Sequence, residues 1–227
     1  MECATTRRFF ALIVTVCSAL FAPSISAHPH MWIDAKAEFV FDDQARLLSI
    51  KQTWRFDDLF SPYAMQGVKK GADGKYPAAT LKSMANDWMD ALGEPISHFF
   101  TRVRVNDETL GFAAPQNARL RWDNTLNRLE LAFTLPLAKP VALSGRQALI
   151  DIYDPTYFVA YDFAGNDVIT LSRAPAECAR KYIPPRELDY ATMQQLAAIP
   201  PDPDPSALPE ELFAITKGLT HRIEIAC

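Results

Sequence analysis

The chain has 227 residues, 49% of them hydrophobic, and carries 23 Lys and Arg against 27 Asp and Glu. A formal net charge of −4 argues against the basic surface that nucleic acids or anionic membranes need, so neither is expected as a partner. The length and the hydrophobic content suffice for a well-packed core.

The first 27 residues are organised like a secretory signal peptide. Arg7 and Arg8 precede an apolar run from Phe9 to Ala22, and a short stretch of small residues ends at Ala27. The run is too short to cross a bilayer, which takes about 20 residues. The sequence therefore predicts a periplasmic protein that is cleaved after Ala27 and is not inserted in the membrane. The export route, general secretory or twin-arginine, stays open.

A long β-hairpin is predicted at the start of the mature chain. Residues 31–41 and 47–57 alternate between apolar and polar side chains, the pattern of half-buried strands, with a turn at residues 42–46. Opposite charges pair across the strands when Glu38 faces Lys51 and Asp34 faces Arg55, and this register is the favoured one. The apolar face of the first strand consists of Ile33, Ala35, Ala37, Phe39 and Phe41, and that of the second of Leu48, Ile50, Trp54 and Phe56.

The rest of the chain predicts one main helix followed by many short strands. Pro77–Leu92 has helical spacing of apolar residues, including Trp88 and two methionines that we expect to lie on the sheet. Further strands are expected at residues 98–105, 118–122, 128–135, 147–153, 158–163, 168–171 and 222–227, a second helix at 186–197 and a Pro-rich linker at 200–205.

These elements predict an α+β fold that is mostly antiparallel β-sheet. The long N-terminal hairpin leads into a sandwich-like or curled sheet, with one main helix packed on it. We expect residues 28–227 to form a single domain, with two closely packed parts, 28–95 and 96–227, as the alternative.

Two cysteines remain once the signal peptide is removed. Cys178 and Cys227 are an even number of thiols in an oxidising compartment, so a disulfide between them is predicted.

A candidate metal site lies at the new N-terminus. His28 and His30 would offer two imidazoles and a free amine, all ligands of transition metals, and the hairpin returns Asp57 and Asp58 to the same end. Pro29 has no N–H to lose, so the square-planar amide mode typical of copper and nickel is blocked and zinc is favoured, with nickel, cobalt or copper as alternatives. The competing interpretation is a solvated chain end.

A second candidate is the segment from Asp151 to Tyr157, which is dense in Tyr and Asp at a turn. Asp154 and Tyr157 are expected to form a pocket wall together with Trp32, although a plain turn would use Asp and Pro for their backbone preferences alone. His98 and His221 are expected to be structural. The chain has no Gly-rich phosphate loop, Gly-x-Ser-x-Gly elbow or His-Glu-x-x-His motif, and no catalytic residue is predicted.

Residues 28–34, 53–58 and 153–157, with the late cysteines, resemble a family of exported bacterial proteins of unassigned function. Its members are commonly labelled periplasmic components of an ABC-type transport system and tend to occur with permeases of the nickel/cobalt type. The resemblance implies a periplasmic role in transition-metal handling, with an inner-membrane metal permease as partner.

Three functions follow from these observations. The favoured one is a non-enzymatic accessory or substrate-binding component that carries Zn, Ni or Co for a metal transport system. The first alternative is a copper oxidoreductase that uses the amine and two imidazoles of an N-terminal histidine brace. The second is a secreted β-rich interaction module without metal.

Overall fold

The structure, a computed structural model, describes residues 29–106, 108–165, 167–197 and 210–227. The predicted signal peptide, His28 and the predicted Pro-rich linker lie outside these ranges. The predicted N-terminal hairpin is confirmed: β1 (Met31–Phe41) pairs antiparallel with β2 (Arg46–Phe56), in the register that sets Glu38 opposite Lys51 and Asp34 opposite Arg55. The Lys51 ammonium lies 3.0 Å from the Glu38 carboxylate.

The hairpin departs from the prediction in two details. Arg55 stands opposite Asp34 in the strand pairing, but its guanidinium forms a salt bridge with the Glu130 carboxylate on the neighbouring strand, at 3.4 Å. Leu47, not Leu48, is the buried leucine of β2. The register between β2 and β6 shifts between Leu47 and Ser49, and such an irregularity moves one side chain to the other face.

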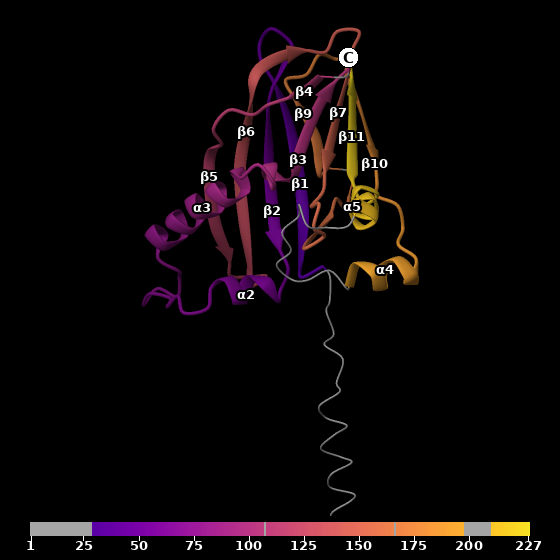
Figure 1. Cartoon of the computed structure of the whole chain (residues 1–227). Helices are drawn as coiled ribbons and strands as arrows, with labels where there is room; N and C mark the ends of the chain where they lie inside the picture. The colour runs from indigo at the N-terminus through magenta and orange to yellow at the C-terminus, as the bar shows by residue number, and fades with distance from the viewer. Residues whose placement is uncertain (1–28, 107, 166, 198–209) are drawn as a thin grey trace, which may run out of the picture.

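The strands form two sheets (Figure 1). The first has the order β5 (Gln116–Asp123), β6 (Arg128–Ala142), β2, β1, β8 (Val159–Asp162), and β9 (Ile169–Ser172) also pairs with β1. The second has the order β10 (Ala179–Ile183), β11 (His221–Ala226), β7 (Gln147–Ile152), β3 (Thr101–Val105), β4 (Glu108–Leu110). The expected α+β class and the mostly antiparallel pairing are confirmed.

One edge of β1 is parallel, which the sequence did not predict. β8 pairs with residues 31–34 of β1 and β9 with residues 37–40, both in parallel. The chain leaves β7 in the second sheet, crosses at residues 153–158 and enters the first sheet alongside β1. The Asp- and Tyr-rich segment singled out in the sequence is thus the crossover between the two sheets.

The helices are few and short, apart from α3 (Ala78–Gly93), which lies near β5 (Figure 1). Its Ala85 and Met89 are buried, and Trp88 packs edge-on against Phe56 at 5.3 Å, as its spacing predicted. The others are α2 (Phe60–Ala64), α4 (Tyr190–Ala197) and α5 (Glu210–Lys217).

The strand predicted from His98 begins only at Thr101. Residues His98–Phe100 form a 3₁₀ turn, and their φ angles of 46°, 53° and 48° are all left-handed. Side chains disfavour this region by roughly 1–2 kcal/mol per residue, so a sequence of bulky residues gives no hint of it.

A single hydrophobic core contains side chains from both sheets. Within it, a chain of buried hydrogen bonds links β2 to β3. The Trp54 indole donates to the Gln52 side-chain oxygen at 2.8 Å, the Gln52 amide nitrogen donates to the Thr101 hydroxyl at 2.7 Å, and that hydroxyl donates to the Phe99 carbonyl at 2.9 Å.

The predicted disulfide between Cys178 and Cys227 is present. It joins the ends of β10 and β11, where Ala179 stands opposite Ala226. None of the helices in the described ranges is long and apolar enough to span a bilayer.

Replacing Cys178 and Cys227 with serine should lower the free energy of unfolding by about 4 kcal/mol, because the bond closes a loop of 49 residues in the unfolded chain. Urea titration of the double variant against the parent measures this. A thiol reagent applied to the denatured, unreduced protein that lacks residues 1–27 should label no cysteine. Two labelled thiols would contradict the bond.

Replacing Gln52 with leucine should cost about 1–3 kcal/mol, because the buried Trp54 indole loses its acceptor. The matched control is Thr53→Val, one residue along the same strand on the half-buried outer face, which we expect to change stability by less than about 0.5 kcal/mol. Equal effects of the two substitutions in a urea titration would show that the hydrogen-bond chain contributes nothing.

Candidate functional site

The start of β1 is held in place by the crossover. The backbone N–H of His30 donates to the Phe158 carbonyl at 3.0 Å, and its imidazole stacks on the Phe158 ring with centroids 4.9 Å apart. Trp32, the second residue of β1, is 53% exposed although it is large and apolar. The first residues of β1 therefore contact the segment in which the chain crosses from β7 to β8. Figure 1 shows α2 and α4 at the same end of the molecule.

Asp57 faces Trp32, as the predicted register requires. The Asp57 N–H donates to the Trp32 carbonyl at 3.0 Å, and one carboxylate oxygen of Asp57 accepts the Trp32 N–H at 2.7 Å. The other oxygen accepts the N–H groups of Leu59 at 2.8 Å and Phe60 at 2.7 Å, which closes the turn into α2. Three of the roughly four acceptor positions of this carboxylate are thus occupied by backbone donors.

The described part of the metal-ligand set does not assemble by itself. Asp58 is exposed beside Asp57, but the described residues contain no group of three or more His, Cys, Asp or Glu side chains placed to hold a metal ion. His30, Asp57 and Asp58 therefore do not form a three-ligand site, because Asp57 is committed to the backbone. His28, the fourth predicted ligand, lies outside the described residues.

The crossover is organised around the side chain of Asp154. One carboxylate oxygen accepts the N–H and the hydroxyl of Thr156, both at 2.8 Å, and the other accepts the N–H of Val159 at 2.9 Å. The Phe158 N–H donates to the Thr156 hydroxyl oxygen at 3.4 Å. Burial raises the pKa of Asp154, and these hydrogen bonds oppose the rise. The carboxylate of Asp154 thus stabilises the turn that follows it, as the interpretation of this segment as a plain turn expects.

Trp32, Asp154 and Tyr157 nevertheless line one cavity, as the sequence predicted for a pocket wall. We call it the end cavity; its volume is about 150 Å³, and its polar and aromatic wall residues are Trp32, Tyr153, Asp154, Tyr157, Tyr161, Arg186 and His221. Tyr157 has a left-handed φ of 55°, a conformation that costs free energy and that the three hydrogen bonds to Asp154 hold in place.

The sequence did not assign Tyr161, Arg186 and His221 to this wall. They belong to β8, to the segment before α4 and to β11, which are far apart in the chain. His221 lies beside the crossover because β11 pairs with β7, which sets His221 opposite Ile152. A single sequence does not reveal this pairing, so it gave no signal that could have placed His221 in the wall.

His221 is a buried neutral imidazole. Its Nδ1 lies 2.7 Å from the Tyr182 hydroxyl. Burial lowers the pKa of His221 to about 4, although the neighbouring Tyr161 backbone opposes the shift.

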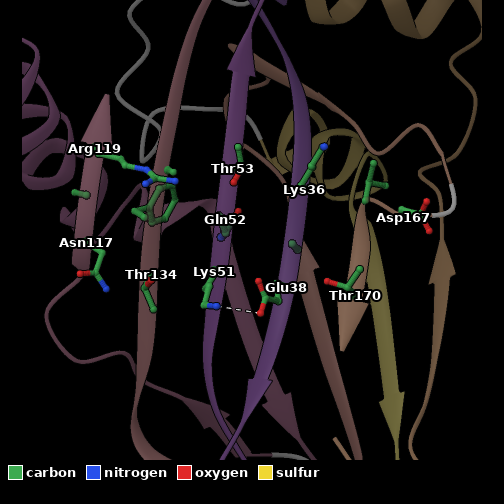
Figure 2. Close-up of a pocket in the computed structure, with 15 residues that line it drawn as sticks. Lys36, Glu38, Lys51, Gln52, Thr53, Asn117, Arg119, Thr134, Asp167 and Thr170 are labelled. Carbon is green, nitrogen blue, oxygen red and sulfur yellow. Dashed lines mark hydrogen bonds and ion pairs between the residues drawn. The ribbon is translucent and has the colours of Figure 1, made fainter. Parts of the chain in front are cut away.

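A larger hollow lies elsewhere, on the outer face of the first sheet. It has a volume of about 720 Å³, and the side chains labelled in Figure 2 come from five strands, β5, β6, β2, β1 and β9, and from the loop before β9. Lys36, Lys51 and Arg119 mix there with Glu38 and Asp167, and Lys51 pairs with Glu38. Mixed charge on the open face of a twisted sheet is typical of a solvated surface, so we place no ligand there.

These features define an α+β protein of two packed sheets, with a polar and aromatic cavity where the chain crosses between them. The chain belongs to the family described as "Protein of unknown function (DUF1007)", which matches residues 13–227. It is also similar to a Haemophilus influenzae protein described as "Uncharacterized protein", with 25% identity over 164 residues, which is 71% of this chain and 75% of that protein. Neither description names a ligand or a reaction, so the function must be argued from the residues.

His221 makes stability depend on pH. Between about pH 6.5 and 4 the unfolded chain binds a proton at this imidazole and the folded protein does not, so stability falls as the pH falls through this window, by at most roughly 3 kcal/mol. Urea titrations across the window measure the loss, which His221→Gln should reduce. The raised pKa of Asp154 acts with the opposite sign, so an Asp154→Asn variant should show the larger loss at low pH. A flat wild-type profile and an unchanged His221→Gln profile would contradict a buried neutral ring.

Proposed function

We propose that the protein binds one transition-metal ion at the start of β1, as a periplasmic accessory of a metal transport system, and that it catalyses no reaction. The observation that carries the proposal is the anchoring of His30 to the crossover, by its backbone bond to Phe158 and by its stacked ring. If the chain is cut after Ala27, this anchored histidine is the third residue of the mature protein. The amine and imidazole of His28 then lie two residues away from a fixed imidazole.

The ligands that fit this arrangement are the His28 amine, the His28 imidazole and the His30 imidazole. Asp57 is less suitable than the sequence suggested, because its oxygens accept three backbone N–H groups. A set of three nitrogens leaves at least one coordination position for water or for a ligand from a partner. An open position suits a protein that passes its ion to a permease.

The metal that we favour is zinc. Pro29 cannot supply the deprotonated backbone nitrogen that square-planar copper or nickel chelation at a third-position histidine needs. Imidazole and amine nitrogens in a tetrahedral arrangement suit Zn(II), which has no geometric preference of its own. An inner-membrane permease of the nickel/cobalt type is the partner that the family resemblance suggests.

The test uses the protein that begins at His28, and first determines by mass spectrometry that the exported protein has this N-terminus. Competition titrations with a zinc-binding dye should show one site, which His30→Ala weakens at least about tenfold because it removes one of three ligands. The matched control is His98→Ala, since His98 lies in the turn before β3, where its ring centroid is 6.1 Å from that of Phe112. Asp57→Asn should change zinc affinity much less than His30→Ala.

Pro29→Ala should raise copper and nickel affinity and produce the visible absorption of square-planar coordination, because residue 29 then has an N–H to lose. An unchanged nickel spectrum would contradict the proposed ligand set. Native protein that carries copper and consumes oxygen in the presence of a reductant would favour the histidine-brace oxidoreductase instead. Protein that holds no metal from zinc-replete cells would favour the interaction module.

A further inference from the structure

The end cavity has a wall of hydrogen-bond donors. Two of its polar residues are already engaged: Asp154 accepts three hydrogen bonds from the crossover, and Nδ1 of His221 lies 2.7 Å from the Tyr182 hydroxyl. Three of the roughly four acceptor positions of Asp154 are therefore occupied. The hydrogen-bond donors that the wall can still offer to a ligand are the tyrosine hydroxyls and the Arg186 guanidinium.

The hydroxyl of Tyr161 is the unusual group in this wall. Tyr161 is 6% exposed, and its hydroxyl is buried with no hydrogen-bond partner among the residues that the structure describes. A buried hydroxyl without a partner costs free energy, whereas phenylalanine would fill nearly the same space at no such cost. A tyrosine in this position is explained if the hydroxyl serves a molecule that enters the cavity.

Arg186 supplies the positive charge at the mouth of the cavity. Its side chain is exposed and lies directly over Gly218, where an added Cβ would stand 2.7 Å from the Arg186 Nε. The backbone holds the same position, since the Arg186 N–H donates to the Gly218 carbonyl at 3.3 Å. Because Gly218 has no side chain, the guanidinium of Arg186 has room beside the cavity.

The size of the cavity limits what can bind. Its volume of about 150 Å³ equals that of an engineered protein cavity that holds benzene. The rings of Trp32 and Tyr157 are part of the lining, so an apolar or aromatic body meets suitable surface.

We propose that the end cavity binds a small organic monocarboxylate of about the size of benzoate, through the Tyr161 hydroxyl and the Arg186 guanidinium. The carboxylate accepts from both donors, and the remainder of the ligand contacts the aromatic wall. A primary amine of the same shape is disfavoured, since Arg186 repels it and three of the roughly four acceptor positions of Asp154 are occupied. The site is separate from the metal ligands proposed above and does not depend on them.

The experiment compares three molecules of one shape: benzoate, benzyl alcohol and benzylamine. Each is titrated into the purified protein in the presence of a chelator, so that no metal contributes, and binding is followed by calorimetry and by amide NMR shifts of residues 153–161. Benzoate should bind with a dissociation constant in the millimolar range or tighter, benzyl alcohol more weakly and benzylamine weakest.

Variants separate a ligand-binding hydroxyl from a structural one. Tyr161→Phe should raise the melting temperature of the ligand-free protein and at the same time weaken benzoate, because the same hydroxyl is costly when empty and useful when occupied. Arg186→Gln should weaken benzoate about tenfold through the loss of a charged hydrogen bond, without changing the melting temperature. The matched control is Arg146→Gln, an exposed arginine in the turn that bonds Cys227, at the disulfide end of the molecule. Gly218→Ala should act like Arg186→Gln, because its Cβ displaces the guanidinium.

Three results would overturn the proposal. The first is the absence of saturable benzoate or acetate binding at millimolar concentration. The second is benzylamine binding more tightly than benzoate, which would indicate a site for cations. The third is a Tyr161→Phe variant that is less stable than the parent and binds benzoate equally well, since the hydroxyl would then have a structural partner.

Discussion

The packing of the two sheets depends on a hydrogen bond between two polar side chains, Gln52 and Thr101, that are buried in the hydrophobic core. Gln52 stands among buried aliphatic and aromatic residues on the inner face of β2, and its amide reaches across to Thr101 at the start of β3. In a medium of low dielectric constant an unpaired amide or hydroxyl is expensive, so both sheets can pack only where these two groups meet. The bond thereby fixes the position of the second sheet relative to the first.

The consequences of this bond extend to the cavity. The Thr101 hydroxyl donates a hydrogen bond to the carbonyl of Phe99, which lies in the left-handed turn that precedes β3. The next residue, Phe100, places its ring near Trp54 and accepts the backbone N–H of Tyr153 at 3.1 Å. Tyr153 leads directly into Asp154 and the crossover. A strained turn that costs free energy is thus held by the core hydrogen bonds on one side and supports the wall of the end cavity on the other.

Local patterns predicted much of this fold because their causes are local. The alternation of β1 and the opposite charges of Glu38 and Lys51 predicted both the buried face and the register of the hairpin, and the disulfide was predicted from the expected compartment and the cysteine count. The parallel edge of β1 was not predictable, because it depends on where the chain crosses between sheets. For the same reason Trp32, Asp154 and Tyr157 could be grouped from their residue types, but Tyr161, Arg186 and His221 could not. Asp57 shows what residue type alone does not reveal: a carboxylate near two histidines suggests a ligand, whereas the backbone N–H groups of Trp32, Leu59 and Phe60 donate to its oxygens.

The position of β11 gives the disulfide a role in the cavity. This strand is formed by residues 221–226, lies between β10 and β7 in the interior of its sheet and carries His221 into the cavity wall. Without β11, one edge of β7 would be unpaired and the cavity would lack one side. The bond between Cys178 and Cys227 covalently holds this interior strand beside β10. Reducing conditions would loosen first the strand that carries His221, so thiol redox state and the integrity of the cavity are physically coupled.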